Sequence, residues 1–214
     1  DDIVKGEDDT YLGEGANEAA VDHAIIGNKS EETPAGAVFA KLQLKAKKIT
    51  KKSIKISWKK ISDCKYVVYG AKCGSKYKKL ATTKKNTYTM KNLKKGKYYK
   101  FIVVALKDEK VVSTSQSVHV ATKGGKVGNY KLVKLNKTKI TLKTNKTFKI
   151  KAKQIKDSKQ IKVKNHRGLK YESSNTKVVK VTSRGKIKAV GNGTAYVYVY
   201  SQSGVFNKIK VKVK

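Results

Sequence analysis

Arginine, proline and long apolar runs are scarce in this chain of 214 residues. Its single proline, Pro34, and its sixteen glycines exclude a collagen-like or proline-rich segment. The longest clean apolar run, FIVVAL at 101–106, is far shorter than the roughly 18 residues of a membrane-spanning helix. The first residues, DDIVKGEDDT, lack the basic and apolar regions of a signal peptide. We therefore expect no insertion into a membrane, and no signal peptide within this chain.

Cysteine and histidine are also rare, and their spacing gives no sign of a metal site. Cys64 and Cys73 are separated by KYVVYGAK, a predicted strand that would hold them about 30 Å apart if fully extended. A disulfide needs Cα atoms within about 7 Å of each other, so two free thiols are expected. His23, His119 and His166 lie in three different regions, and no CxxC pair occurs. No metal and no cofactor is predicted.

Carboxylates are sparse outside the first 38 residues, which argues against catalysis. A hydrolase needs two placed carboxylates, or a nucleophile beside a base, and no spacing here signals either. Phosphate-binding glycine loops are absent as well. We expect a non-catalytic protein. The carboxylates of the body are Asp63, Asp108, Glu109, Asp157 and Glu172.

Positive charge, by contrast, is abundant and unevenly distributed. The formal net charge is +36, from 51 Lys plus Arg against 15 Asp plus Glu. Residues 1–38 hold ten acidic residues and two lysines, so the body of the protein is more basic than the total suggests. Such a body attracts polyanions by releasing their counterions. Because base readers favour arginine and this chain has only Arg167 and Arg184, no specific nucleic-acid readout is expected.

The acidic residues 1–38 form a leader or linker that we expect to be weakly structured. Within it, VDHAIIG at 21–27 could form one short strand. The charge contrast also suggests that this leader folds back on the basic body and screens it. On that hypothesis, deleting residues 1–38 would tighten binding to heparin.

The rest of the chain alternates apolar and polar residues in short runs that turn signals separate. Val179, Val181, Ile187 and Ala189 alternate with lysines, the period of two that a half-buried strand needs. The glycine-rich stretch KGGKVGNYK at 123–131 divides these runs into two sets. The sequence therefore predicts an all-β protein with two tandem immunoglobulin-like β-sandwiches, at 39–123 and 131–214, joined by a linker at 124–130.

The first predicted sandwich resembles a fibronectin type III domain. The resemblance is carried by Trp58, by YVVYG at 66–70 and by LKKGKYYKFIVVA at 93–105. Leu93, Gly96 and Tyr99 fit the Leu-x-x-Gly-x-x-Tyr pattern of that family, which implies that Tyr99 is a corner tyrosine whose hydroxyl bonds to the backbone. No Arg-Gly-Asp is present, so the integrin binding of some relatives does not transfer.

The second predicted sandwich is similar to a bacterial immunoglobulin-like domain of group 2. Its pattern is an aromatic residue before Ser-Ser-Asn, then Val-x-x-Val, Gly-x-Ile-x-Ala, Gly-x-Ala and a closing strand. The resemblance implies a surface or secreted protein of a Gram-positive bacterium, of the kind found in gut Firmicutes. The residues that fit are Tyr171, Ser173, Ser174, Asn175, Val178, Val181, Gly185, Ile187, Ala189, Gly193, Ala195, Ile209, Val211 and Val213.

The outward lysines of the second sandwich are the candidate contacts for a polyanion. Lysine on exposed strands also guards against edge-to-edge aggregation, and an AT-rich genome would favour lysine codons over arginine codons, so its abundance has three explanations. Tyr196, Tyr198 and Tyr200 share one parity; their rings could stack on sugars or bases, or merely cover the sheet while valines fill the core. The candidate contacts are Lys180, Lys186, Lys188, Lys208, Lys210, Lys212 and Arg184.

These observations favour an extracellular or cell-wall-associated module that acts as a spacer, or as an adhesion module for anionic cell-wall polymer or glycan. We expect it to be a monomer. Two alternatives stay open, namely a polyanion-binding protein whose ligand is nucleic acid, and the accessory C-terminal end of a longer secreted enzyme.

Overall fold

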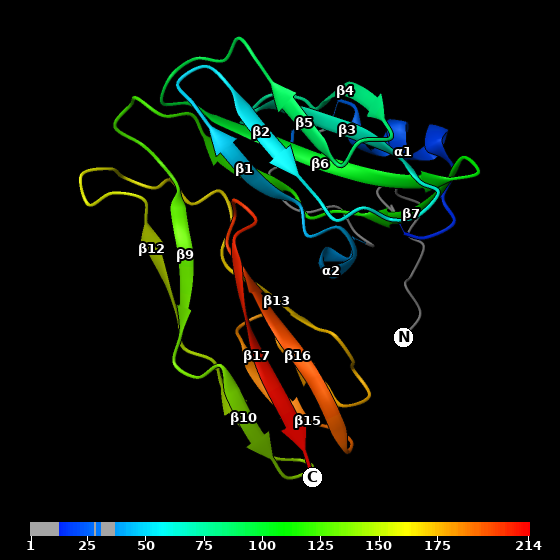
Figure 1. Cartoon of the computed structure of the whole chain (residues 1–214), viewed down its shortest axis with the longest axis vertical. Coiled ribbons are helices and arrows are strands. Elements are labelled where there is room, and N and C mark those ends of the chain that lie inside the picture. Colours follow the sequence, from blue (N-terminus) through cyan, green and yellow to red (C-terminus); the bar gives the residue numbers. More distant parts are fainter. Residues whose placement is uncertain (1–12, 28, 31–36) are drawn as a thin grey trace.

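In the computed structural model, strands form two groups stacked along the longest axis of the molecule (Figure 1). The structure describes residues 13–27, 29–30 and 37–214. The predicted leader therefore falls partly outside the described residues, at 1–12, 28 and 31–36.

The first group of strands forms two antiparallel sheets that face each other across an apolar core. One sheet has the order β1-β2-β5, and the other has the order β4-β3-β6-β7 with β8 also paired to β6. Ile54 and Ile56 from the first sheet and Phe101 and Val103 from the second are fully buried in this core. The strands are β1 (Lys45–Ile49), β2 (Ile54–Ser57), β3 (Lys65–Lys72), β4 (Lys78–Thr83), β5 (Thr87–Met90), β6 (Tyr98–Lys107), β7 (Lys110–Thr114) and β8 (Val118–Ala121).

The second group also packs sheet on sheet. A four-stranded sheet of order β10-β17-β16-β13 faces a three-stranded sheet of order β11-β15-β14, and β9 pairs with β12 beside them. Val197 and Val211 from one sheet meet Val179 and Ile187 from the other, all fully buried. The fold is thus all-β, as the alternating pattern predicts. The strands are β9 (Tyr130–Leu135), β10 (Lys139–Leu142), β11 (Thr147–Lys149), β12 (Ala152–Lys156), β13 (Lys170–Ser173), β14 (Val179–Val181), β15 (Lys186–Ala189), β16 (Gly193–Tyr200) and β17 (Phe206–Val213).

The residues behind the fibronectin-like resemblance lie in the first core or at its edge. The hydroxyl of Tyr99 accepts a hydrogen bond from the backbone N–H of Lys94 at 3.0 Å, which is the expected backbone tie. Gly96 has a positive φ of 62°, and a Cβ there would meet the Cα of Gly125 at 2.7 Å. Leu93 is buried in the same core, and so is Trp58, which lies just after β2.

A similar close approach occurs in the second sandwich. Gly185 has a φ of 82°, and a Cβ on it would lie 2.8 Å from the ring of Tyr171. That ring packs against the second core. Gly193 begins β16, which pairs in the sheet opposite to that of β15. The chain therefore crosses from one sheet to the other at residues 190–192.

The described part of the acidic leader is helical, so the prediction of a short strand at 21–27 is wrong. Helix α1 (Glu18–Ile25) is capped by Asn17, whose side chain accepts a hydrogen bond from the N–H of Ala20 at 2.8 Å. Val21 and Ile25, four residues apart, share one face of this helix, and both are buried.

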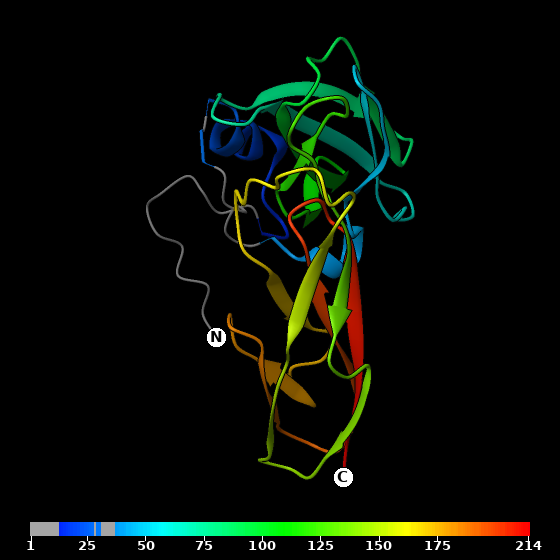
Figure 2. The same cartoon turned by 90° about the vertical axis from the view of Figure 1, so that its left-hand side faces the viewer.

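Helix α1 covers the outer face of the five-stranded sheet. Val21 and Ile25 pack against Val67, Tyr69 and Ile102, residues that point away from the first core. Figure 2 shows α1 lying alongside the strands of the first sandwich. The described leader residues are therefore part of the fold, which corrects the expectation of a weakly structured segment.

Helix α2 (Phe39–Leu42) contacts both sandwiches. Leu42 is fully buried in the first core, while the ring of Phe39 packs edge-on against Tyr200, with centroids 5.2 Å apart. The backbone N–H of Phe39 donates to the carboxylate of Glu172 at 2.9 Å. This short helix therefore links the two sandwiches at their junction.

Arg167 lies at the centre of the junction and is almost fully buried. Its guanidinium donates to the carbonyl of Ser117 in the first sandwich at 3.3 Å and to that of Ser201 in the second at 3.1 Å. It also donates to the side chain of Gln116. The turn at 201–204 reaches the first sandwich here (Figure 1), where the N–H of Ala46 donates to the carbonyl of Ser203 at 3.1 Å. Because these bonds are buried, they fix the orientation of one sandwich on the other.

Candidate polyanion-binding surface

The last strand, β17, presents three lysines on one face. Lys208, Lys210 and Lys212 are exposed, while Ile209 and Val211 between them are fully buried. Because side chains alternate along a strand, the three lysines project from the same face at intervals of about 7 Å.

The strands beside β17 extend this face. On β16, Tyr196 lies opposite Lys210 and Tyr198 lies opposite Lys208, while Lys139 of β10 lies opposite Lys210 on the other side. The Nζ atom of Lys208 is 4.6 Å from the centre of the Tyr196 ring, within the range of a cation–π contact. We call this surface the tyrosine–lysine face; its members are Tyr196, Tyr198, Lys139, Lys208, Lys210 and Lys212.

Tyr200, the third tyrosine that alternates with valines on β16, is not available to a ligand. Tyr200 is fully buried, packed against Phe39 and against Phe206 at 5.4 Å between ring centroids. Tyr196 and Tyr198 are half-buried, and Val197 and Val199 fill the core. The row therefore offers two rings at the surface, and its third ring belongs to the junction.

The other predicted lysines lie on the opposite side of the second sandwich. Lys180 on β14 and Lys186 and Lys188 on β15 are exposed, and Lys180 lies directly opposite Lys188. Their sheet and the sheet of β17 pack on opposite sides of the same core. The outer faces of the two sheets therefore point in opposite directions. We call these three residues the β14–β15 lysine face. Arg184 is exposed in the turn before β15.

The tyrosine–lysine face has little internal compensation for its charge. Residues 131–214 contain only two carboxylates, Asp157 and Glu172. The carboxylate of Glu172 is turned toward the N–H of Phe39 and the hydroxyl of Tyr200, and burial raises its pKa. Like charges on neighbouring strands, as at Lys139 of β10 and Lys210 of the parallel strand β17, repel each other. A bound polyanion would relieve that repulsion.

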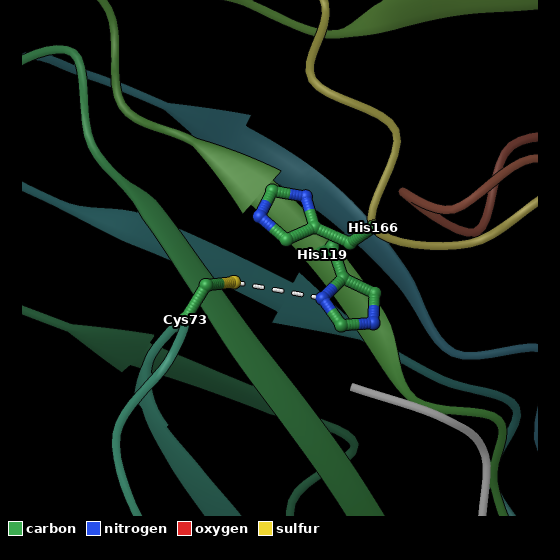
Figure 3. Close-up of side chains that lie close together, drawn as sticks. All are labelled: Cys73, His119 and His166. Atoms are coloured by element: carbon green, nitrogen blue, oxygen red, sulfur yellow. Dashed lines mark hydrogen bonds between the residues drawn. The ribbon is translucent and has the colours of Figure 1, made fainter. Parts of the chain in front are cut away.

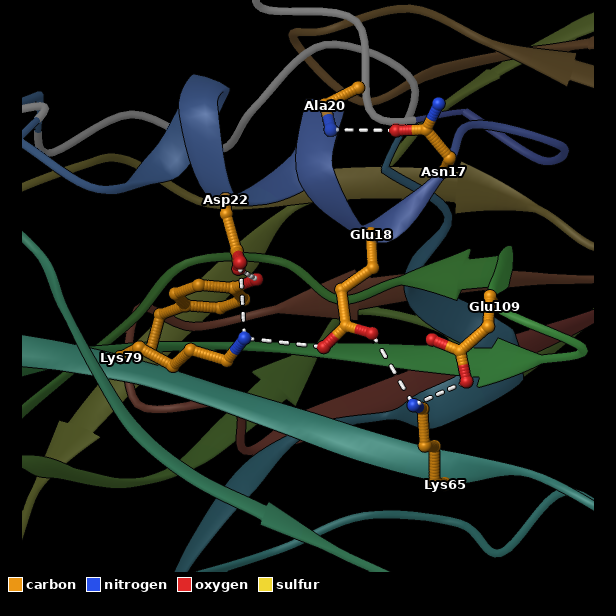
Figure 4. A network of polar contacts seen from close by, with 8 residues as sticks. Asn17, Glu18, Ala20, Asp22, Lys65, Lys79 and Glu109 are labelled. Carbon is orange, nitrogen blue, oxygen red and sulfur yellow. Dashed lines mark hydrogen bonds and ion pairs between the residues drawn. The ribbon is translucent and has the colours of Figure 1, made fainter.

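The first sandwich differs, because carboxylates of the leader contact its lysines (Figure 4). Glu18 lies 3.3 Å from the ammonium of Lys65 and 3.2 Å from that of Lys79, and Asp22 lies 3.0 Å from Lys79. Lys65 also donates to Glu109 at 2.7 Å, a hydrogen bond that raises the pKa of Lys65. Exposed ion pairs add little to stability, so the apolar face of α1 contributes more to holding the leader in place.

This arrangement changes the test of charge screening by the leader. Deleting residues 1–38 would also uncover apolar side chains such as Val67 and Ile102 beneath α1. The double variant Glu18→Gln with Asp22→Asn removes the two carboxylates that contact Lys65 and Lys79 and leaves that apolar packing in place.

Three residues that the sequence places far apart come together at the junction. Candidate ligand atoms of Cys73, His119 and His166 all lie within 4.8 Å of one another (Figure 3). The prediction that the histidines are scattered is therefore wrong for two of the three. Their separation along the chain gives no local signal, because strand pairing in the first sandwich brings Cys73 to His119 and the docking of the two sandwiches brings His166 to both.

Cys64 and Cys73 are not joined in a disulfide, as the spacing predicts. In the part of the chain that the structure describes, neither α1 nor α2 could span a membrane.

Comparison with known proteins places a fibronectin type III-like domain in the first sandwich. The family model described as "PBP1-like, fibronectin3-like domain" matches residues 45–117, about a third of the chain. No curated protein matches the chain.

Several solved structures are similar to a part of the chain. The FN5 domain of Drosophila Lar is 23% identical, with a TM-score of 0.33, and the alignment covers 38% of this chain and 92% of that one. The fibronectin type-III domain of human fibronectin type III domain containing protein 3 is 22% identical, with a TM-score of 0.35, covering 42% and 93%.

Proposed function

We propose that this chain is a non-catalytic module of a bacterial surface or secreted protein, and that its tyrosine–lysine face binds anionic cell-wall polymer or glycan. The observation that carries the proposal is the face itself: four lysines and two tyrosines on adjacent strands, next to a carboxylate that is turned inward. Fibronectin type III-like domains are typical of extracellular proteins, which supports the location.

The form of the face suits an extended polymer. Lysines repeat along β17 at about 7 Å, so a chain of regularly spaced anionic groups can contact several of them at once. Each contact releases counterions, which makes the affinity dependent on salt. The half-buried rings of Tyr196 and Tyr198 offer apolar surface on which sugar units can pack. The ligand class that fits is therefore a polymer of sugars or polyols joined by phosphate or bearing carboxylate.

The bacterial origin rests on the second sandwich. Its Gly185 and Tyr171 are in close contact, and both belong to the pattern of bacterial immunoglobulin-like domains of group 2. Small β-sandwiches in tandem, with a buried polar junction between them, suit a stiff spacer that holds a ligand-binding face away from a surface. Spacer and adhesion roles are compatible in one chain, and either would also suit the accessory end of a longer secreted enzyme.

Nucleic acid is the second candidate ligand, and one observation weighs against it. Of the two arginines, Arg167 is buried in the junction, which leaves Arg184 as the exposed one. Bidentate readout of bases and phosphates relies on arginine, so a nucleic acid would be held here by lysine contacts without sequence preference.

Two matched triple variants test the proposal in the full chain. Lys208, Lys210 and Lys212 are replaced by Gln in one variant, and Lys180, Lys186 and Lys188 in the other, so that both lose the same charge. Binding to Gram-positive cell walls that carry teichoic acid is then measured across a salt series.

The proposal predicts that the first variant loses most of its binding and that its salt slope falls by up to about 3, by analogy with polyanion binding by lysines in general. The β14–β15 variant should change little. An equal loss in both variants would mean that net charge alone drives binding and would refute a specific face.

A further inference from the structure

We propose that Cys73, His119 and His166 form a binding site for a divalent transition metal, with Zn²⁺ as the natural ion, at the junction of the two sandwiches. The site is independent of the polyanion-binding face. A thiolate and two imidazoles are ligands that Zn²⁺ and Co²⁺ prefer. Three protein ligands leave a fourth position, which water can take.

The spacing of the first two ligands already suits a metal. The sulfur of Cys73 lies 3.5 Å from Nδ1 of His119. At a tetrahedral zinc, with bonds of about 2.3 Å to sulfur and about 2.0 Å to nitrogen, a sulfur and a nitrogen ligand lie about 3.6 Å apart. The distance between these two atoms is therefore already that of two ligands of one ion, and the imidazole needs only to tilt so that its Nδ1 points at the ion.

The surroundings of His119 also favour ligation through Nδ1. His119 is fully buried on β8, and its Nε2 lies 3.3 Å from the hydroxyl of Ser117. That hydroxyl is in turn 2.7 Å from the hydroxyl of Tyr77. A ring protonated at Nε2 donates to Ser117 and leaves Nδ1, the nitrogen near the sulfur, unprotonated and able to bind a metal. Metal-ligating histidines are usually oriented by such a hydrogen bond from their other nitrogen.

His166 completes the set and requires one movement. Its ring stacks on that of His119, with centroids 5.1 Å apart and planes 3° from parallel. A metal lies in the plane of each imidazole that binds it, so stacked parallel rings cannot share an ion. The His166 ring must rotate out of the stack. Its ligand nitrogen must also move about 1 Å closer to the ligand atoms of Cys73 and His119. Its loop is already anchored, since the N–H of His166 donates to the side chain of Gln202 at 2.8 Å.

The site would connect the two sandwiches. Cys73 follows β3 and His119 belongs to β8, both in the first sandwich, whereas His166 lies in the loop between β12 and β13 of the second. An ion held by all three ties the junction together and stabilises the docked arrangement. Binding displaces the thiol proton of Cys73 to solvent, so the affinity should increase with pH.

The test uses the full chain, reduced and stripped of metal with a chelator, and titrated with Co²⁺ and then Zn²⁺. One equivalent of Co²⁺ should give a visible d–d spectrum of tetrahedral type and a sulfur-to-cobalt charge-transfer band, and Zn²⁺ should abolish both. Zn²⁺ should also raise the melting temperature of the chain.

The chain supplies its own controls, because it has one further cysteine and one further histidine. Cys73→Ser should lose the charge-transfer band, and His166→Ala should weaken Co²⁺ binding by more than about 100-fold. Cys64→Ala and His23→Ala should bind Co²⁺ like the parent chain. The melting temperature of each metal-free variant shows that it is folded.

The proposal would be overturned if the parent chain bound no Co²⁺. It would also be overturned if Cys73→Ser and His166→Ala bound Co²⁺ as tightly as the parent chain. A charge-transfer band that disappears in Cys64→Ala and persists in Cys73→Ser would overturn it as well.

Discussion

The docking of helix α1 on the first sandwich leads to a quantitative prediction for the substitution Ile25→Ala. The Ile25 side chain is 2% exposed and packs on the outer face of the five-stranded sheet, whereas its neighbour Ile26 is 44% exposed. Replacing a buried isoleucine with alanine costs about 2–5 kcal/mol. Ile25 lies at the end of a surface helix that can relax, so we expect about 2–3 kcal/mol. The higher helix propensity of alanine offsets a few tenths of a kcal/mol of this loss in stability, as a rough estimate.

The assay is equilibrium unfolding in urea followed by tryptophan fluorescence. The chain has one tryptophan, Trp58, and its side chain is buried in the first core, so the signal reports on this sandwich. Ile26→Ala is the matched control and should change the free energy of unfolding by less than about 0.5 kcal/mol.

The leader can also detach before the sandwich unfolds, and that sets a limit on the effect. In that case the decrease in the free energy of unfolding measured by Trp58 fluorescence cannot exceed the free energy with which α1 docks. Hydrogen exchange in α1 would also be faster than in the core strands. Equal effects of Ile25→Ala and Ile26→Ala, with no change in α1 exchange, would refute the docking of the leader.

Three further substitutions test other parts of the structure. Tyr99→Phe removes the hydroxyl that accepts the N–H of Lys94, and urea unfolding should show a loss of about 1 kcal/mol; no loss would mean that the tie has no energetic role. Gly185→Ala combines a φ of 82° with a contact of 2.8 Å to Tyr171 and should lower the melting temperature, whereas Gly168→Ala has nothing within 4 Å and should not; equal shifts would contradict this. Burial raises the pKa of Glu172 above its ordinary 4.5, so its ionisation costs stability as the pH rises from about 4.5 through the raised pKa. Glu172→Gln should remove this pH dependence and leave the protein at least as stable at pH 7, and a less stable variant at pH 7 would show that the carboxylate is needed at the junction.

Strand content and strand faces could be predicted from the sequence because each depends on local alternation. Ile209, Val211 and Val213 face the core and the lysines between them face solvent, as the period of two requires. Tyr99 was predictable for a similar reason, since the residues that fix its role, Leu93 and Gly96, are close in sequence.

The leader was mispredicted because its acidic composition outweighed a helical signal. Asn17 is a good N-cap, and Val21 and Ile25 are spaced by four, which together favour a short amphipathic helix. The partner of that helix, the outer face of β3 and β6, could not be identified, because both faces of those strands are apolar. An apolar run in the sequence shows that both faces of a strand are covered, but it does not show whether a helix or a second sheet covers each face.

The junction was beyond prediction because it depends on how the two sandwiches dock. Arg167, Gln116 and Ser201 are ordinary polar residues in sequence, and only the docked arrangement buries them together. Cys73 and His119 meet within the first sandwich through the pairing of β8 with β6, and only His166 reaches them through the docking.

The most direct test of the central claim is the binding of the full chain to purified Gram-positive cell walls, with and without teichoic acid, across a salt series. Binding that requires the teichoic acid and weakens steadily with salt is the predicted result. Equal binding to both wall preparations, or binding to neither, would contradict the claim that the lysines of β17 serve to hold an anionic wall polymer.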